Sequence, residues 1–266
     1  MLDIRMNPEQ IAGYRRDGFV VLPEVFTPGE CHAVIEHQMA LAEGRLTVEG
    51  QEPRDTAAAN WGRSFNPHVH DAEALHLLIH PKLQAPLEQV VHDGQPGQAD
   101  GIQTMYFWHG STQRRHQDQY YLPSCMSAWC AFVDVNEDNG TIWVQKGSHR
   151  GDLVTKDDLR NKYGDADVFS EHYNDMVDAL FEQHAEVDGL KESPVVASAG
   201  DVVLFHGRLI HRGGPIGKPG MFRHVMANHY IPHDSSDWPY TEWPRYDFAG
   251  NKRFTTLGDH VGAEQP

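Results

Sequence analysis

Residues 114–123 read RRHQDQYYLP, and the His-Gln-Asp triplet inside them is the most informative part of the sequence. Side chains at positions i and i+2 of an extended segment point the same way, so His116 and Asp118 can present an imidazole and a carboxylate to one ion. The chain has 18 histidines, which makes spacing alone weak evidence for a metal site. Residues 68–70 and 184–186 have comparable spacing, and a hydrogen-bonded histidine–aspartate pair is the structural alternative.

A second informative stretch, residues 198–214, reads SAGDVVLFHGRLIHRGG. It predicts a strand, then His211 just beyond the end of that strand, then a turn and a returning strand that opens with Arg223. His211 is therefore the candidate third ligand. Two imidazoles and one carboxylate on one face leave three positions of an octahedral ion open, an arrangement that suits Fe(II) in oxygen chemistry.

Several arginines near these ligands are candidates for an anion site. Arg223 supplies a planar guanidinium that can bind a carboxylate through two parallel hydrogen bonds. Arg212 is adjacent to His211 and points to the opposite face of an extended chain, so Arg223 is the better candidate. Arg114 and Arg115 are interpreted either as contacts for an anionic substrate or as part of a solvated loop, which is the commoner case.

Short segments rich in β-branched and aromatic residues surround these motifs and predict strands. They are residues 19–22, 102–108, 126–135, 141–145, 195–197, 202–206 and 223–231. Asn139-Gly140 predicts a two-residue hairpin between two of them.

Capping patterns and helical spacing predict helices, most of them before the strands. They cover residues 8–17, 28–42 with Gly44 as the cap, 71–79 and 81–92, and they recur in an insertion at 152–181. Helices followed by many short antiparallel strands predict an α+β chain, mostly β with flanking helices, around a barrel or a double-sheet jelly roll.

The absence of repeats and linkers predicts one domain over residues 1–266. It would comprise N-terminal helices at 7–92, a jelly-roll core at about 101–232 and a C-terminal tail at 233–266. The polar, aperiodic stretch 45–66 predicts a loop, interpreted as a flap beside the site. Three roles are open for the aromatic residues 238–244: covering the mouth of the site, packing against another subunit, or completing the core.

The overall composition disfavours several classes of protein. Lys and Arg total 22 against 38 Asp and Glu, a net charge of −16 that repels phosphate backbones, so no nucleic-acid partner is expected. Three cysteines without CxxC spacing predict neither a disulfide framework nor a thiolate zinc site. No apolar run approaches the roughly 20 residues that span a bilayer. With no secretory signal visible, no membrane association and a cytoplasmic location are predicted.

The sequence resembles the phytanoyl-CoA dioxygenase-like branch of the iron(II)/2-oxoglutarate-dependent oxygenases over most of its length. The matches occur in order at YRRDGFVVLP (residues 14–23), His116-Gln117-Asp118 with Tyr121 and Pro123, Ala128-Trp129, Asn139-Gly140, Gly147-Ser148-His149 and residues 200–211.

This resemblance implies a double-stranded β-helix, a cupin-like jelly roll wrapped by helices. His116, Asp118 and His211 would bind iron, and Arg223 would bind the distal carboxylate of 2-oxoglutarate. The cofactors would be Fe(II), 2-oxoglutarate and O2.

The resemblance also implies that Met105, with Gln103 two residues before it on the same strand face, lies beside the cosubstrate. Trp129 would form the far wall. A methionine or tryptophan on a strand is about as often a core residue. Two positions depart from the family pattern: Gly213 replaces a hydroxyl residue that assists the carboxylate-binding arginine, and Lys146 replaces the proline before the Gly-Ser-His turn.

The implied reaction converts 2-oxoglutarate to succinate and CO2 while it hydroxylates an unactivated C–H bond of a small molecule. Asp118 favours hydroxylation over halogenation, because related halogenases lack this carboxylate; desaturation and ring formation stay open. Tyr120, on the face of His116 by strand parity, and His229, on the face of Arg223, are candidates to line the pocket. No Lys/Arg cluster suits a nucleotide diphosphate, which disfavours an acyl-CoA substrate.

Two other classes of function are weighed. A non-redox metal hydrolase or isomerase on a cupin-like barrel would use the same ligands but needs no arginine after the last one. A catalytically silent binding barrel is disfavoured by the intact set of ligands and arginine.

Overall fold

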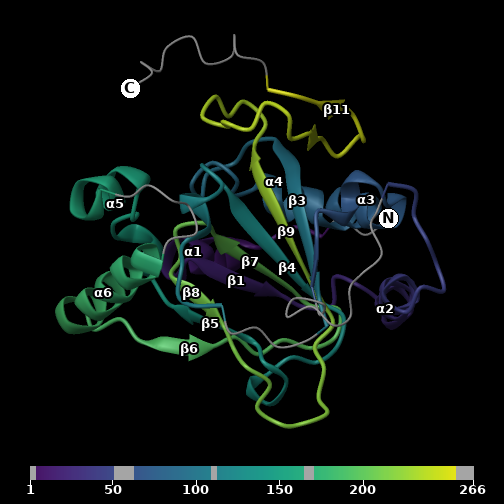
Figure 1. Ribbon diagram of the computed structural model, residues 1–266, viewed down its shortest axis with the longest axis horizontal. Coiled ribbons are helices and arrows are strands. Elements are labelled where there is room, and N and C mark those ends of the chain that lie inside the picture. Colours follow the sequence, from purple (N-terminus) through teal and green to yellow (C-terminus); the bar gives the residue numbers. More distant parts are fainter. Residues whose placement is uncertain (1–3, 51–62, 109–112, 165–170, 256–266) are drawn as a thin grey trace.

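Two antiparallel sheets form the centre of the molecule (Figure 1). The computed structural model describes residues 4–50, 63–108, 113–164 and 171–255. The major sheet has the order β1-β7-β4-β9-β3-β10-β11, with β2 also paired to β3, and the minor sheet has the order β6-β5-β8. The expected jelly roll with flanking helices is confirmed.

The major sheet contains β1 (Phe19–Leu22), β2 (Arg63–Phe65), β3 (Ala99–Phe107), β4 (Met126–Ala131), β7 (Val202–His206), β9 (Val225–Pro232), β10 (Arg245–Tyr246) and β11 (Lys252–Arg253). The minor sheet contains β5 (Ile142–Gln145), β6 (Glu192–Pro194) and β8 (His211–Gly213).

The major sheet is covered on both faces, which explains why every residue of β4 and β9 is buried. Its outer face, with Leu204 and Tyr230, packs against helical residues such as Leu83. Its inner face, with Trp129 and Val203, packs against Val144 and other residues of the minor sheet side. Because side chains alternate along a strand, residues 225, 227 and 229 of β9 all face this interior.

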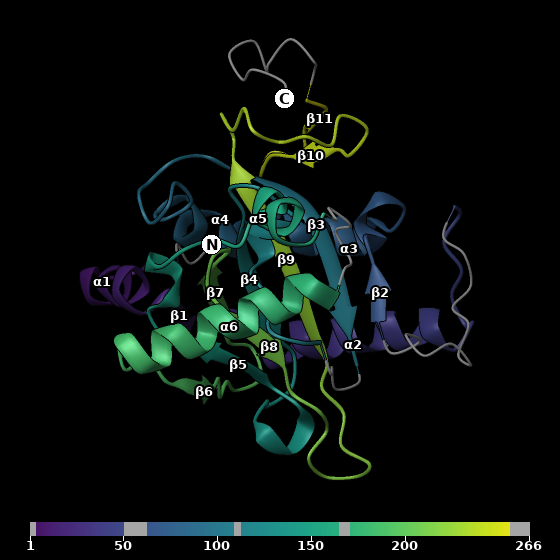
Figure 2. The ribbon, with the colours of Figure 1, turned by 60° about the vertical axis from the view of Figure 1, so that its left-hand side comes forward.

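Helices form in all the segments where the sequence predicts them. They are α1 (Pro8–Asp17), α2 (Pro28–Ala42), α3 (Ala72–Leu78), α4 (Pro81–Glu88), α5 (Lys156–Tyr163) and α6 (Glu171–Val187). Short 3₁₀ turns are η1 (Pro67–Val69), η2 (Asp118–Tyr120), η3 (Glu137–Asn139) and η4 (Ser148–Arg150). Figure 1 shows α5 and α6 at the left, on the side of the minor sheet, and α2 and α3 at the right; in Figure 2 the left-hand side comes forward, and α6 lies in front of the sheets.

The N-terminal capping boxes of the first two helices form as expected. Asn7 and Gln10 exchange hydrogen bonds at the start of α1, which Gly18 ends with a φ of 81°. Thr27 and Glu30 do the same at the start of α2. The C-cap of α2 is Glu43 and not Gly44, which follows it with a φ of 71°.

The predicted two-residue hairpin at Asn139-Gly140 is wrong. β4 and β5 belong to different sheets, and the chain crosses between them through η3. The Asn139 amide donates to the Asp134 carbonyl at 2.7 Å. Gly140 has a φ of 82°, and a Cβ there would lie 2.7 Å from the Gly214 carbonyl. The Asn-Gly pair is thus required by a tight crossover and not by a hairpin.

Some strand and helix boundaries also differ from the expectation. The regular strand predicted at 195–197 lies three residues earlier, at Glu192–Pro194. Beyond it the Val195 N–H still donates to the Ile142 carbonyl at 2.9 Å, and Ala197 forms an isolated bridge with Val135. β4 and α4 end four residues before the predicted 135 and 92. Part of the predicted loop at 45–66 is the edge strand β2, and residues 51–62 lie outside the described part of the chain.

The N-terminal segment and the tail both contribute strands to the major sheet. β1 pairs with β7 at one end of it, and Tyr246 of β10 pairs with Gly101 of β3. The division into helices, core and tail is therefore not a division into separate layers; a single domain stays a prediction.

Within the described residues, no helix combines the length and apolar character that crossing a membrane requires.

Candidate metal centre

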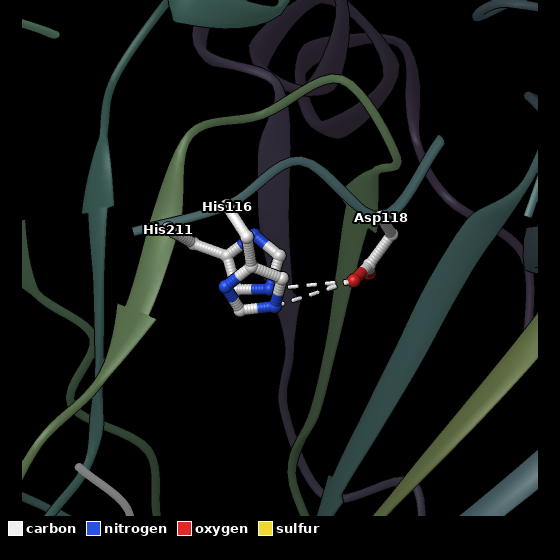
Figure 3. A group of neighbouring side chains, drawn as sticks. All are labelled: His116, Asp118 and His211. Atoms are coloured by element: carbon white, nitrogen blue, oxygen red, sulfur yellow. Dashed lines mark ion pairs between the residues drawn. The ribbon is translucent and has the colours of Figure 1, made fainter. Parts of the chain in front are cut away.

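The side chains of His116 and Asp118 converge with that of the distant His211 between the two sheets (Figure 3). One ligand atom each from His116, Asp118 and His211 lies within 4.8 Å of the other two, and all three residues are buried. Asp118 Oδ1 lies 3.5 Å from His116 Nε2 and 3.7 Å from His211 Nε2. Among the described residues, this is the group of histidine, cysteine and carboxylate side chains that could hold a metal ion.

Backbone pairing places the two imidazoles side by side. The His116 N–H donates to the His211 carbonyl at 2.9 Å, and the reverse bond is 3.1 Å long. This bridge continues the minor sheet beyond β8, and it sets the two ring centroids 4.1 Å apart.

His116 and Asp118 point the same way, as expected for an extended segment, but that segment is only one residue long. Gln117 is extended, with φ −123° and ψ 122°, which turns His116 and Asp118 the same way. Asp118 then begins the 3₁₀ turn η2, so the strand parity used for Tyr120 is wrong. The Tyr120 ring instead stacks on Tyr173 of α6, with centroids 3.7 Å apart.

Second hydrogen bonds orient both imidazoles for metal binding. His116 Nδ1 lies 2.9 Å from the Arg114 carbonyl, and His211 Nδ1 lies 3.0 Å from the Leu209 carbonyl. A carbonyl only accepts, so each Nδ1 carries the proton and each Nε2 has a free lone pair, the arrangement usual for histidine ligands. The amide of Gln113 lies 3.0 Å from His116 Nε2, and its exposed side chain can turn away from a bound ion.

The protonation states in this cluster also suit a cation. Burial raises the pKa of Asp118, but the His211, His229 and His116 imidazoles outweigh it and hold the pKa well below its ordinary value. Burial, with a contribution from His211, lowers the pKa of His116 to about 4. The centre therefore offers a carboxylate and a neutral imidazole at neutral pH.

Helix α6 holds the loop that carries the first two ligands. The Gln117 N–H donates to the Tyr173 hydroxyl at 2.8 Å, and that hydroxyl donates to the Gln117 carbonyl at 3.0 Å. Arg114 pairs with Asp175 and Asp178, at 2.8 Å and 2.7 Å.

The neighbouring arginines have structural partners too. Arg115 pairs with Asp178 and Glu192, and Arg212 pairs with Glu192 at 2.8 Å. The ion pairs of Arg114 and Arg115 favour a structural role over a substrate contact for both residues.

Replacing Tyr173 with phenylalanine tests this support. The variant removes the hydroxyl between two backbone groups of Gln117 and leaves the ring stacked on Tyr120. We expect a loss of about 1–3 kcal/mol in the free energy of unfolding and metal binding about 10-fold weaker or more, as for other outer-shell partners. Denaturant unfolding and metal titration measure the two effects. Tyr163→Phe, on the more exposed Tyr163 of α5, is the control; equal effects in both variants would contradict the proposed support.

Arg223, the predicted carboxylate-binding residue, lies two residues before β9. Its side chain is 2% exposed, and its guanidinium carbon lies 5.3 Å from the centre of the Phe107 ring. One Nη donates to the Gly140 carbonyl, whereas Nε has no hydrogen-bond partner. Within the described ranges, no carboxylate pairs with Arg223. Burial lowers its pKa to about 10, so it is a buried cation that still lacks an anion.

The other predicted cosubstrate residues lie on the inner face of the major sheet. Met105 and Trp129 flank Ala227 in one register row, and Gln103 occupies the next row, opposite His229. Trp129 and Gln103 are buried, and Met105 is half-buried. Their predicted contact with the cosubstrate stays a prediction.

Residues 68–70 and 184–186, the comparison motifs with ligand-like spacing, contain histidines that make ordinary polar contacts. His68 Nδ1 lies 2.9 Å from the Thr104 hydroxyl, and His184 Nδ1 lies 3.3 Å from the Gln145 side chain. Their partners in the motifs, His70 and Glu186, are exposed.

The departures from the family pattern leave the turns intact. Gly147 adopts a φ of 84° before η4, and Lys146 Nζ lies 5.4 Å from the Phe19 ring. Gly213 offers no side chain that could assist Arg223.

Two further residues contact the second carboxylate oxygen of Asp118, Oδ2. Ser127 Oγ donates to Asp118 Oδ2 at 3.0 Å, and His229 Nε2 lies 3.4 Å from the same oxygen. The sequence gives a signal for His229, because the alternation of side chains along the predicted strand places it on the same face as Arg223. Ser127 carries no such signal, because only the pairing of β4 with β9 brings it opposite His229.

Comparison with known families decides the assignment. The sequence model of the family described as Phytanoyl-CoA dioxygenase (PhyH) matches residues 14–225, which include all three candidate ligands and Arg223. The chain belongs to the phytanoyl-CoA dioxygenase family. The resemblance expected from the sequence is confirmed, and the enzyme class of this family is the iron(II)/2-oxoglutarate-dependent dioxygenases, as expected.

The relatives found by sequence similarity are distant from this chain. Phytanoyl-CoA dioxygenase 1 of Oryza sativa subsp. japonica is 29% identical over 53% of this chain and 48% of its own length. Ectoine dioxygenase of Bordetella bronchiseptica is 24% identical over 77% of this chain and 69% of its own length. The chain thus spans about half the length of the rice relative.

Solved structures share the fold. EctD from S. alaskensis with bound Fe superposes with a TM-score of 0.63 at 17% identity, covering 87% of this chain and 79% of that one. The carbocyclase SnoK from nogalamycin biosynthesis gives a TM-score of 0.61 at 18% identity, covering 85% and 84%. At these identities the likeness concerns the jelly-roll architecture.

Proposed function

We propose that this protein hydroxylates an unactivated C–H bond of a small-molecule substrate and releases succinate and CO2 from 2-oxoglutarate. His116, Asp118 and His211 would hold Fe(II), and Arg223 would bind the distal carboxylate of 2-oxoglutarate. The observation that carries the proposal is the combination of two imidazole Nε2 atoms and a carboxylate at one point with a buried guanidinium whose Nε has no hydrogen-bond partner.

The residues present fit these groups. Three monodentate ligands on one face leave three positions of an octahedral ion open, and the iron, when bound, supplies the oxygen chemistry. Arg223 can form parallel hydrogen bonds to a carboxylate, which would give its free Nε a partner. The inner-face row with Met105, Ala227 and Trp129 would exclude water from the cosubstrate.

Asp118 supports hydroxylation within this class, since related halogenases lack the carboxylate. The ectoine and phytanoyl-CoA dioxygenase relatives support a small-molecule substrate. The alternative of a non-redox metal hydrolase gives no reason for an unpaired cation at Arg223, and neither does a silent binding barrel.

Anaerobic titration tests the enzyme class. Addition of Fe(II) and then 2-oxoglutarate to the folded protein should produce the weak visible charge-transfer band of the chelate. Iron-loaded, folded protein without this band would refute the proposal.

A substrate screen tests the reaction. Succinate release from a panel of small molecules identifies the substrate, and ¹⁸O2 should place one labelled oxygen in the product and one in succinate. The structural neighbours include an epimerase and a carbocyclase, so a product without the label would replace hydroxylation by one of those outcomes.

Replacing Arg223 with alanine should separate cosubstrate binding from metal binding. Loss of a buried charged partner costs about 2–5 kcal/mol, so we expect 2-oxoglutarate binding weaker by roughly 30-fold or more with unchanged Fe(II) affinity. Thermal shift gives a second measurement: 2-oxoglutarate should stabilise the metal-loaded wild type but not the variant. Arg208→Ala, which removes an arginine bound to the Gly151 carbonyl, is the control. A loss of Fe(II) affinity in R223A as large as that in Asp118→Ala would contradict the role assigned to Arg223.

A further inference from the structure

We propose that Ser127 and His229 act as positioning residues that hold Asp118 to a metal through one oxygen only. The proposal rests on the metal site described above. Ser127 and His229 are register partners on the neighbouring strands β4 and β9, and both side chains face the interior. They are 0% and 2% exposed.

The two oxygens of Asp118 have different surroundings. Oδ1 faces the Nε2 atoms of His116 and His211, at 3.5 Å and 3.7 Å. Oδ2 faces away, with the Ser127 hydroxyl at 3.0 Å and His229 Nε2 at 3.4 Å. Two donors on Oδ2 occupy the lone pairs with which it would otherwise bind the ion.

Hydrogen bonding sorts the three histidines around Asp118 into two kinds. The Nδ1 atoms of His116 and His211 each lie within 3.0 Å of a backbone carbonyl, so their protons stay on Nδ1 and Nε2 is free to ligate. His229 Nδ1 is buried without a hydrogen-bond partner. Because a carboxylate only accepts, the His229 proton belongs on Nε2, facing Oδ2. His229 is thereby a donor to Asp118 and not a fourth ligand.

One-oxygen ligation matters because it conserves coordination positions. With three monodentate ligands, an octahedral ion keeps three positions, enough for a bidentate 2-oxo acid and one O2. If Asp118 bound through both oxygens, only two positions would remain. The hydrogen bonds that Ser127 and His229 donate to Oδ2, called the clamp below, thus keep a coordination position for O2 after 2-oxoglutarate has bound.

Paired variants test the clamp. Ser127→Ala and His229→Leu remove the donors, whereas Ser127→Thr and His229→Gln retain one at each position. Metal affinity should fall about 10- to 100-fold in each donor-less variant, the range known for outer-shell partners. The conservative variants should stay within about 3-fold of the wild type. Because both donors act on one oxygen, the losses in the double variant should not multiply.

Spectroscopy separates positioning from general packing. Co(II) replaces Fe(II) as the probe, since its visible bands respond to the exchange of a ligand. In the Co(II) complex with 2-oxoglutarate, the wild type should keep one position for a small anion such as azide, so azide should change the visible bands of the wild type but not those of S127A and H229L. Asn228→Ala is the matched control: Asn228 is equally buried on β9, but it faces the opposite side and binds the Leu77 carbonyl.

The outcomes are distinguishable. A wild type that binds neither Co(II) nor Fe(II) would refute the proposed function itself. A wild type that binds metal and 2-oxoglutarate, with S127A and H229L no weaker in metal affinity than N228A, would overturn the clamp alone. A loss confined to the thermal stability of the metal-free variants would also overturn it, because that result is expected from packing.

Discussion

Replacing Asp118 with alanine is expected to abolish tight iron binding. The variant removes the one carboxylate of the candidate centre, which lies 3.5 Å and 3.7 Å from the two imidazoles and is ionised at neutral pH. Outer-shell partners already contribute about 10- to 100-fold to metal affinity, so the loss of a direct ligand should exceed about 100-fold. Isothermal titration with Fe(II) under anaerobic conditions measures the loss, and succinate release should stop with it.

The control for this variant is the acidic residue of a comparison motif. Glu186→Ala removes an exposed carboxylate two residues after His184, so metal affinity should not change. R223A should keep its iron. If the Fe(II) affinity of D118A were within about 10-fold of that of the wild type, the assignment of the metal centre would fail, regardless of the activities of the relatives.

Replacing Asp100 with alanine should cause the largest loss of stability. Asp100 is fully buried at the start of β3, and its carboxylate contacts Arg245 Nε at 3.0 Å, Arg253 Nε at 2.8 Å and His233 Nδ1 at 2.8 Å. Removal takes away the carboxylate that the buried Arg245 guanidinium contacts. Breaking a buried pair in this way costs about 3–5 kcal/mol, which corresponds to a fall in Tm of roughly 10 °C.

The matched control is a surface pair of similar chemistry. Asp157→Ala breaks the exposed pair between Asp157 and Arg160 in α5, and surface pairs contribute little. Arg253 is itself partly exposed, so Arg253→Ala should cost less than D100A. The order of Tm values, D100A below R253A below D157A, is the expected result. A D100A variant as stable as D157A would mean that the tail does not depend on this carboxylate.

The Asp100 cluster also bears on the aromatic residues 238–244. Arg245 follows them directly and donates to the Pro232 and His233 carbonyls. The Trp238 ring is completely buried and packs with Ile231 and Leu122, and the Tyr240 hydroxyl donates to the Tyr121 carbonyl at 2.6 Å. Of the three roles considered for this stretch, completing the core is the one that these contacts support.

Much of the local structure was predictable because its causes are local. Asn7 and Thr27 cap helices through residues three positions away, and Gly18 adopts the left-handed backbone that ends α1. The His-x-Asp geometry needs only one extended residue, Gln117. Errors arose where strand pairing is irregular, as at 195–197, or where a turn joins two sheets, as at Asn139.

The sequence by itself determined the chemical types present: two imidazoles and a carboxylate in ligand-like order, an arginine after the last of them, and enough short strands for a jelly roll. Only the tertiary structure brings His116 and His211 to one point and gives His229, another of the 18 histidines, its place beside Asp118. The backbone bridge sets His116 beside His211, and the register of β4 against β9 sets Ser127 beside His229. Each tautomer depends on which carbonyl or carboxylate lies within hydrogen-bond distance of the ring. For His116 and His211 that carbonyl belongs to a residue two positions earlier in the chain, whereas the carboxylate beside His229 is brought there by packing across the sheets.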